Sequence, residues 1–464
     1  LASAVRLRYA RATRSGKRNR QHLIGATHRP GGTSRILVLG AYGLIGSGVA
    51  RHLLDSGHSV TGLGRSKAFA QRVLPKIDWI IRDMADLRSP SDWRPIVDGC
   101  DAVINCAGAL QDGPRDQLQA IHADAVSALA KTCATSGVRL VQISAAGVSP
   151  DASTAFFRTK AAGDAAIRAT GGDFTILRPG LVIAPTAYGG TALLRMLAAF
   201  PLAQPIAWPD TPVRTVSLVD LSQAVAMAAR GDLGSGETID LVEDQPHHLE
   251  TIVSGMRHWL GFPKARMKIA VPPALASLIS RGADAVGRLG WRSPLRTTAI
   301  RVMQDGVDGD PARWEALTDR SLASFQETLA AMPARTEDRI GARMALAMPF
   351  AVAALFFFWA ASGIVGFWRA EAASGVLTAG GWPPGLAKAS VLFWSTIDVA
   401  LAALVLVRRH AARACLAMAA VSLFYLVAAT LFTPWLWTDP LGSLVKIVPT
   451  IMLALVTCAM LQER

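Results

Sequence analysis

The sequence predicts an α/β fold, a doubly wound parallel sheet with a small substrate subdomain, followed by a four-helix transmembrane bundle. Three observations support this: a strand, a glycine-rich loop and a helix near residue 40, repeated strand and helix patterns after them, and four long apolar runs near the end. The 464 residues exceed what one compact core holds, so several domains are expected. We predict a basic disordered leader at 1–34, an α/β domain at 35–250, a mostly helical extension or linker at 251–340 and a transmembrane domain at 341–464.

The positive charge is concentrated at one end of the chain. Residues 1–35 hold nine Lys and Arg and no Asp or Glu, against a formal net charge of +14 for the whole chain. The basic composition is therefore a property of this segment, and no nucleic-acid partner is expected. The segment lacks a long apolar stretch and so does not resemble a secretory signal, although its Arg and Ser content resembles a transit peptide. We interpret it as a disordered leader.

The five cysteines form no CxxC pair and no spacing suited to zinc. We expect all of them to be reduced residues of the core or of the apolar runs, and we expect no metal site. They are Cys100, Cys106, Cys133, Cys415 and Cys458.

The first strand and its loop predict a nucleotide site. RILVLG, residues 35–40, is a short apolar run that leads directly into GAYGLIG, and a helical stretch then continues to about Ser56. Gly40 permits a tight turn, Gly43 lets the backbone approach a pyrophosphate, and Gly46 lets the helix pack on the strand. The phosphates would lie at the helix N-terminus. The unit therefore predicts a Rossmann-like, dinucleotide-binding domain.

Strands continue to alternate with helices, as a doubly wound sheet requires. A long helix is expected from about Asp116 to Ser136, and a later helix is expected to begin at Asp220 as its N-cap. The further strands are predicted at 58–63, 77–81, 101–106, 138–144 and 173–178.

The end of the second strand favours NADP(H) over NAD(H). An NAD site usually has an acidic residue about 20 positions after the loop, which holds the ribose 2′-hydroxyl. No acidic residue occurs from Ser56 to Ile77, where the chain instead has Arg65 and Lys67. A guanidinium grips a 2′-phosphate well. The alternative is that Arg65 is a solvated loop charge.

These residues resemble the short-chain dehydrogenase/reductase superfamily in its extended or atypical branch. The similarity covers roughly residues 35–250 and is greatest to the NAD(P)H-binding group that includes NmrA-like proteins and the NADPH-binding accessory subunit of respiratory complex I. It rests on the motifs GAYGLIG (40–46), RDM (82–84), NCAG (105–108), ISAAG (143–147), KAAGDAA (160–166) and ILRPG (176–180).

The resemblance implies a set of cofactor-binding residues. Asp83 and Met84 would flank the adenine, Ala107 and Gly108 would pass beneath the ribose and nicotinamide, and Pro179 would contact the nicotinamide side. The loop residues that would meet the phosphates are Gly40, Tyr42, Gly43, Leu44, Ile45 and Gly46.

The catalytic residues of the family match this chain only in part. Ser144 falls where the family has its active-site Ser, and Lys160 matches the Lys that holds the nicotinamide ribose and lowers the pKa of the catalytic Tyr. That Tyr is replaced by Phe156, which removes a general acid that is worth about 10²–10⁴ in rate. Tyr188 is a candidate replacement donor or a plain loop residue. His122 falls about where many members have Asn, and we interpret it as structural rather than catalytic.

Four apolar runs, at about 344–367, 389–407, 412–432 and 442–461, approach the ~20 residues that span a bilayer. A soluble bundle is the alternative, but these runs lack its polar faces. In hydropathy and arrangement they are similar to the DoxX-like family, which is often fused to such NAD(P)-binding domains.

Arginines cluster before the first run and between the second and third. Positive residues mark the cytoplasmic side, so we predict a multi-pass protein of the inner or cytoplasmic membrane. Its nucleotide domain and both termini would be cytoplasmic.

Asp398 lies within the second run, where a charge costs roughly 2.5–3.5 kcal/mol on insertion scales and usually has a partner. We predict a buried pair with Lys446, at the start of the fourth run. A proton-linked or quinone-linked role is the alternative to a structural pair.

The sequence supports two main functions. The first is a membrane-anchored NADP(H)-dependent oxidoreductase that acts on a small apolar, quinone or carbonyl substrate from the lipid bilayer, with Ser144 polarising the carbonyl and Lys160 holding the ribose. The second is a non-catalytic NADPH-binding subunit that senses redox state or stabilises a membrane-complex partner, which Phe156 favours. A transporter with a regulatory soluble domain is a third hypothesis, supported only by Asp398.

Overall fold

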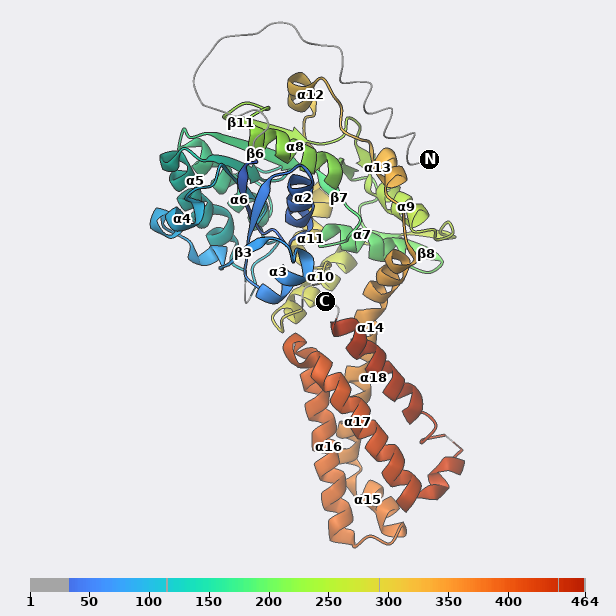
Figure 1. Cartoon of the computed structure of the whole chain (residues 1–464). Coiled ribbons are helices and arrows are strands. Elements are labelled where there is room, and N and C mark those ends of the chain that lie inside the picture. The colour runs from blue at the N-terminus through green and yellow to red at the C-terminus, as the bar shows by residue number, and fades with distance from the viewer. Residues whose placement is uncertain (1–32, 114–115, 292, 441, 463–464) are drawn as a thin grey trace, which may run out of the picture. The chain divides into compact units, whose positions relative to one another are not determined.

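The computed structural model describes residues 33–113, 116–291, 293–440 and 442–462, so the predicted leader falls almost entirely outside it. Seven parallel strands form the main sheet in the order β11-β6-β5-β4-β1-β2-β3 (Figure 1). The predicted parallel sheet is therefore confirmed, and the strand order reverses between β1 and β4. The strands are β1 (Arg35–Leu39), β2 (Ser59–Gly64), β3 (Asp78–Ile81), β4 (Ala102–Asn105), β5 (Arg139–Ile143), β6 (Phe174–Pro179) and β11 (Glu237–Leu241).

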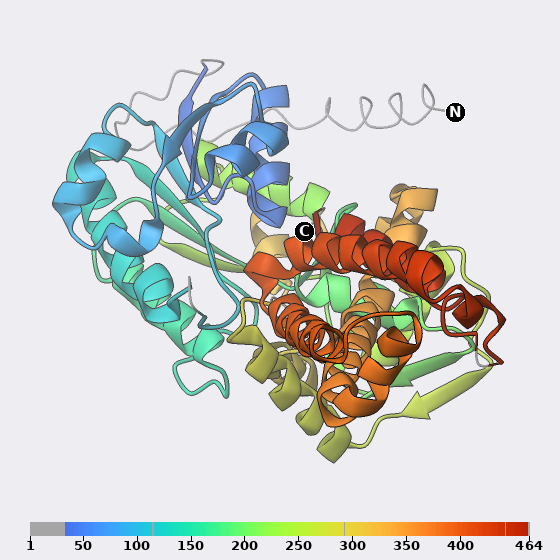
Figure 2. The same cartoon turned by 90° about the horizontal axis from the view of Figure 1, so that it is seen from below.

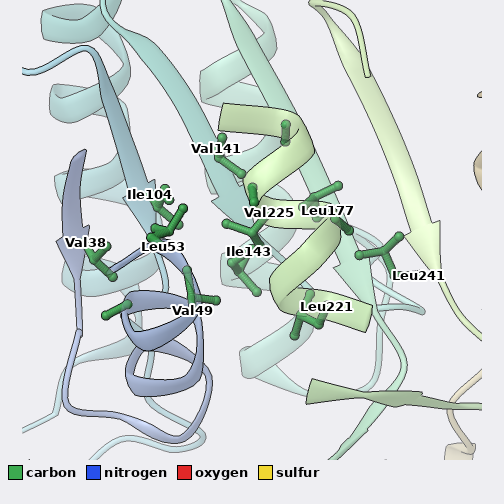
Figure 3. Packing of buried hydrophobic residues seen from close by; sticks show 14 of the residues in the cluster. Val38, Val49, Leu53, Ile104, Val141, Ile143, Leu177, Leu221, Val225 and Leu241 are labelled. Atoms are coloured by element: carbon green, nitrogen blue, oxygen red, sulfur yellow. The ribbon is translucent and has the colours of Figure 1, made fainter. Parts of the chain in front are cut away.

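Helices cover both faces of this sheet because successive strand residues point to opposite faces. On one face, Val38 and Val141 pack against Val49 of α2 and Val225 of α8, as Figure 3 shows. On the other, Leu37 packs in a second cluster with residues of α4, α5 and α6. The sheet is thus doubly wound, as predicted. The helices are α2 (Leu44–Asp55), α3 (Lys67–Val73), α4 (Pro90–Val97), α5 (Ala125–Ser136), α6 (Ala155–Arg168) and α8 (Leu218–Arg230), with a 3₁₀ turn η1 (Met84–Asp86).

One local prediction is confirmed and one needs correction. The predicted long helix is continuous from Leu118 to Ser136, and it includes a π-helical turn, η2 (Ala120–Asp124), before the regular helix α5. Ser217, not Asp220, caps α8. The Ser217 hydroxyl accepts the N–H of Asp220 at 2.9 Å and donates to its carboxylate, because Asp220 lies at the third helical position.

The region predicted to form the substrate side is a smaller assembly of short strands and helices. β8 pairs with β13, β7 with β10, and β9 with β12, while a third apolar cluster joins α7, α9 and α13. The elements are β7 (Leu181–Ile183), α7 (Gly190–Ala198), β8 (Ala203–Ile206), β9 (Pro212–Val213), β10 (Thr215–Ser217), β12 (His247–His248), α9 (Leu249–Trp259), β13 (Met267–Ala270), α10 (Pro273–Gly287), α11 (Thr297–Asp305), α12 (Ala312–Thr318) and α13 (Phe325–Ala331).

The C-terminal helices form the predicted bundle, with one difference in length. Helices α14, α16, α17 and α18 lie side by side in both views and share one apolar cluster (Figures 1 and 2). Among the described residues, three helices are long and apolar enough to cross a membrane. The fourth has 16 residues, because residues 443–446 form a turn. The elements are α14 (Thr336–Trp368), α15 (Ala370–Ala379), α16 (Pro384–Leu406), α17 (Arg408–Phe432), η3 (Pro434–Thr438) and α18 (Ile447–Gln462).

The predicted Asp398–Lys446 pair is wrong. Asp398 is buried, and its carboxylate accepts hydrogen bonds from the hydroxyls of Ser362 at 2.7 Å and Tyr425 at 2.8 Å. Lys446 lies exposed in the turn before α18, and no ion pair joins it to Asp398 in the described part of the bundle. The buried carboxylate of Asp398 therefore has two hydroxyl partners from neighbouring helices, whereas the sequence had predicted a cation as its partner.

The close packing of α6 on the π-helical turn gives a test of the fold. A Cβ at Gly163 would lie 2.1 Å from the carbonyl oxygen of His122, so Gly163→Ala should destabilise the protein by about 1–3 kcal/mol. The matched control is Gly282→Ala, also helical but with no atom within 4 Å of its Cβ position, which should be neutral or stabilise by roughly 0.5–1 kcal/mol. Melting of the purified protein measures both, and equal shifts for the two variants would contradict the packing.

Candidate active site

The glycine-rich loop between β1 and α2 packs so tightly that neither Gly40 nor Gly46 has room for a Cβ atom. Gly40 has φ +67°, and a Cβ there would lie 2.9 Å from Cα of Ala107 at the end of β4. A Cβ at Gly46 would lie 2.3 Å from the carbonyl oxygen of Gly40. α2 begins at Leu44 with Gly43 as its N-cap, and no side chain in the described residues caps it. The first amides of α2, including those of Leu44 and Ile45, therefore lie where an anion can accept their hydrogens.

Arg65 follows the end of β2 and is held by its neighbours. Its backbone N–H donates to the Tyr42 hydroxyl at 2.9 Å, and its guanidinium lies 2.9 Å from Asp116 and 3.5 Å from Asp83. The Tyr42 ring packs on Gly64, where a Cβ would come within 2.3 Å of it. Arg65 is thus an exposed residue at the end of β2, and two carboxylates compete for its guanidinium.

The residues predicted to flank the adenine lie beside this ion pair. One Asp83 oxygen accepts the N–H of Ala85 at 3.0 Å and thereby caps η1, while another oxygen faces Arg65. Met84 is buried in the core behind them. Asp83 thus joins the end of β3 to Arg65.

The loop after β4 is fixed by Asn105. Its buried amide donates to Gln142 at 2.8 Å, and its carbonyl oxygen accepts the N–H of Ala107 at 3.1 Å. A Cβ on Gly108 would lie 3.3 Å from His122 Nε2 and 3.9 Å from Lys160 Nζ, so this glycine meets both side chains. Ala107, Gly108 and Lys160 therefore lie together at the carboxyl ends of β4 and β5.

Lys160 is a buried cation beside Gly108. Its Nζ donates to the carbonyl oxygen of Ile143 at 2.9 Å and lies 5.6 Å from the centre of the Phe156 ring. Burial lowers the pKa of Lys160 to about 8, although the Asp164 carboxylate partly opposes this effect. Lys160 therefore keeps its proton at neutral pH and releases it in mildly basic solution. Phe156, at the position where the resemblance predicts a catalytic Tyr, has no proton to give.

Ser144 belongs to a buried polar triad that the sequence did not predict. Its hydroxyl donates to Asp164 Oδ2 at 2.9 Å, and the same oxygen accepts two hydrogen bonds from the Arg178 guanidinium. Asp164 is fully buried, and its other oxygen has no hydrogen-bond partner among the described residues. The hydroxyl hydrogen of Ser144 is committed to Asp164, although its oxygen can still accept one.

His122 is locked in one neutral form. Its Nε2 accepts the N–H of Ala109 at 3.1 Å, and Nδ1 lies 2.9 Å from the hydroxyl oxygen of Thr159. That hydroxyl donates to the carbonyl oxygen of Ala155, so Nδ1 must carry the ring hydrogen and donate it. Burial, and then the nearby Lys160, lowers the pKa of His122 well below its ordinary value. These contacts agree with the structural interpretation of His122.

Among the described residues, no hydrogen bond joins the Tyr188 side chain to Lys160, Ser144 or His122. This side chain is 63% exposed in the loop that precedes α7, and the Tyr188 backbone N–H donates to the Thr191 hydroxyl at 3.1 Å.

Pro179, which was predicted to contact the nicotinamide side, is the last residue of β6. Its carbonyl oxygen accepts the N–H of Ala146 at 2.9 Å.

Comparison with protein families matches two separate segments. Residues 40–194 match an NAD(P)H-binding family, and residues 356–455 match the DoxX-like family. The chain joins an NAD(P)H-binding domain to a DoxX-like domain. This is the fusion that the sequence predicts.

Solved structures support the fold of the NAD(P)H-binding domain. The enzyme WbmG of Bordetella bronchiseptica, in complex with NAD and UDP, is similar at 17% identity and a TM-score of 0.51, over 65% of this chain and 94% of that one. The dTDP-glucose 4,6-dehydratase of Bacillus anthracis, in complex with NAD, has 12% identity and a TM-score of 0.49, over 65% and 95%. No curated protein sequence matches this chain. At such low identity the first likeness shows a Rossmann-like fold and nothing further.

Asp164 and Asp116 are the site residues that the sequence reasoning missed. Asp164 follows Lys160 by four positions in the KAAGDAA motif, so both lie on one face of α6. That spacing was a usable signal. Asp116 reaches Arg65 across 51 positions, and no local pattern indicates that contact.

Proposed function

We propose that this chain is a membrane-anchored NADP(H)-dependent oxidoreductase of the atypical short-chain dehydrogenase/reductase type, which reduces an apolar carbonyl compound or quinone drawn from the bilayer. The observation that carries this proposal is Lys160, a buried amine with a lowered pKa beside Gly108. A cation that serves only the fold is rarely buried next to a loop where a nicotinamide is expected.

The residues of the front domain fit a dinucleotide. The crowding at Gly40 and Gly46 leaves backbone amides, not side chains, facing the place where a pyrophosphate would lie. Arg65 would bind the adenosine 2′-phosphate, and Ala107 with Gly108 would face the nicotinamide ribose. When bound, NADPH supplies a hydride; the chain supplies position, charge and a proton.

Lys160 supplies that proton in place of the missing Tyr. Phe156 has none, the Ser144 hydrogen is donated to Asp164, and His122 uses both ring nitrogens in fixed hydrogen bonds. A pKa of about 8 suits a general acid near neutral pH. For a carbonyl compound, the hydride would go to the carbonyl carbon while the carbonyl oxygen takes a proton from Lys160 Nζ and becomes a hydroxyl. For a quinone, the hydride and the proton together would give the hydroquinone. The neutral amine then takes up one proton, so that each turnover consumes one NADPH and one proton.

A second function has specific support. Phe156 and the committed hydroxyl of Ser144 also suit a non-catalytic NADPH-binding subunit that senses redox state or assembles with a membrane-complex partner. Such a protein would bind NADPH without turnover, and Phe156→Tyr would give it new activity. The enzyme that we propose turns over without that change.

We place the NAD(P)H-binding domain and both termini on the cytoplasmic side of the inner or cytoplasmic membrane. Arg408, Arg409 and Arg413 at the start of α17, and Arg339 and Arg343 in the first turns of α14, support this orientation by the positive-inside rule.

Turnover and its pH dependence test the enzyme. The full chain in detergent should oxidise NADPH with a membrane-soluble quinone or carbonyl lipid. Because the acid form of Lys160 is needed, kcat/KM should be highest below pH 8 and fall as the pH rises through about 8. Lys160→Met should lower kcat at neutral pH by about 10²–10⁴. Tight NADPH binding with no turnover against the whole substrate panel would favour the non-catalytic function instead.

Arg65 tests the cofactor preference. Arg65→Ser should weaken NADPH binding roughly 10–100-fold and leave NADH binding nearly unchanged, because only NADPH has the 2′-phosphate. Asp116→Asn should act in the opposite direction, since it removes a carboxylate that now competes for the guanidinium. Both affinities can be measured by nucleotide fluorescence. Equal losses for NADPH and NADH in Arg65→Ser would contradict the assignment.

A further inference from the structure

Helix α10 exposes an apolar face that the protein does not cover. Leu275, Leu278, Ile279 and Val286 are 46%, 67%, 43% and 41% exposed, and their spacing places them on one side of the helix. A different side, with Ala276, Ser280 and Gly287, is buried against the protein. α10 thus has two sides of different surroundings: one packs on the rest of the chain, and the apolar side formed by the four residues above faces outward.

The charges around this face are basic. Arg281 and Arg288 are exposed at its edges. The acidic residue of the helix, Asp284, is turned to the protein, where it accepts hydrogen bonds from Gln111 at 2.9 Å and Arg296 at 3.2 Å. An exposed apolar stripe with arginines beside it matches a membrane surface that contains anionic lipids.

The end of α10 is attached to the transmembrane bundle at its basic end. Just after the helix, the carbonyl oxygen of Leu289 accepts the N–H of Arg408 at 3.0 Å. The Trp291 indole donates to the carbonyl oxygen of Leu406, and the Arg408 guanidinium lies 5.7 Å from the centre of its ring. Leu406 ends α16 and Arg408 begins α17, so the chain just after α10 contacts the bundle at the junction of these two long apolar helices.

We propose that α10 lies in the plane of the bilayer surface at the basic end of the bundle, with its exposed apolar face among the lipid chains. Leu275, Leu278, Ile279 and Val286 insert beside the spanning helices, and Arg281 and Arg288 contact anionic headgroups. An amphipathic helix of this kind inserts about 5–10 Å into the boundary between headgroups and acyl chains. The occupant of the face is lipid, not a protein partner.

The same helix joins the membrane surface to the candidate active site. Asp284 of α10 holds Gln111, and Arg296 just before α11 donates to the carbonyl oxygen of Asp112 at 3.1 Å. Gln111 and Asp112 belong to the loop that begins at Gly108 beside Lys160. If the proposed function holds, α10 therefore links the membrane surface to the loop beside Lys160. The membrane contact itself does not depend on that function.

Lipid depth at a single position tests the proposal. The full chain carries Leu278→Cys, labelled with a fluorophore whose emission shifts to the blue in lipid, in nanodiscs of phosphatidylcholine and phosphatidylglycerol. The matched control is Val219→Cys, a residue of α8 with 63% exposure against 67% for Leu278. An unsubstituted chain, labelled in parallel, corrects for the native cysteines.

Position 278 should emit at shorter wavelength than position 219, and doxyl-labelled lipids should quench it about threefold more strongly. Arg281→Gln with Arg288→Gln should reduce the quenching in anionic nanodiscs and leave it unchanged in neutral ones. A blue shift without lipid quenching would mean that protein covers the face, and equal behaviour at 278 and 219 would mean that water does. Either result overturns the proposal. An unchanged melting temperature for each variant shows that the fold is intact, and neither NADPH binding nor turnover is required.

Discussion

The close backbone packing around the glycine-rich loop is the constraint on which the rest of the site depends. Gly40 approaches Ala107 and Gly46 approaches the carbonyl oxygen of Gly40 at distances that no Cβ tolerates. This brings the end of β1, the end of β4 and the start of α2 into one small region, where the strand order reverses. Open α/β sheets bind ligands at such points, and here the neighbouring loop leads directly to Lys160. The glycine-rich loop and Lys160 are therefore connected through the loop that follows β4.

Buried charge is the second feature that needs an explanation. Lys160, Asp164 and Arg178 lie within or beside the core, where apolar residues of similar size would stabilise the fold at least as well. Burial lowers the pKa of Lys160, which means that its charged form costs stability below about pH 8. Function explains such a cost better than stability does. The buried, neutral His122 is the opposite case, because both of its ring nitrogens are held in hydrogen bonds and the Nδ1 hydrogen is donated to Thr159.

The parallel sheet and the membrane helices could be predicted because their signals are local. The apolar runs at 35–40 and 138–144 gave strands within about two residues of those observed. The edge strand β11 was missed because ETIDL is short, contains two acidic residues and is only half-buried. Contacts between distant residues could not be predicted: the hydroxyls that bind Asp398 come from two other helices. The N-cap of α8 was assigned to Asp220 instead of Ser217 because both residue types are good caps, and only the backbone geometry distinguishes them.

The central claim is that this front domain binds a nicotinamide dinucleotide on the cradle formed by Gly40, Gly43 and Gly46. Calorimetric titration of the full chain in detergent with NADPH tests it most directly, alongside the variant Gly46→Ala, whose Cβ would lie 2.3 Å from the carbonyl oxygen of Gly40. The account predicts one site per chain, with binding weakened at least about tenfold in the variant. Absence of binding to the unaltered chain, or equal affinity in both proteins, would contradict it.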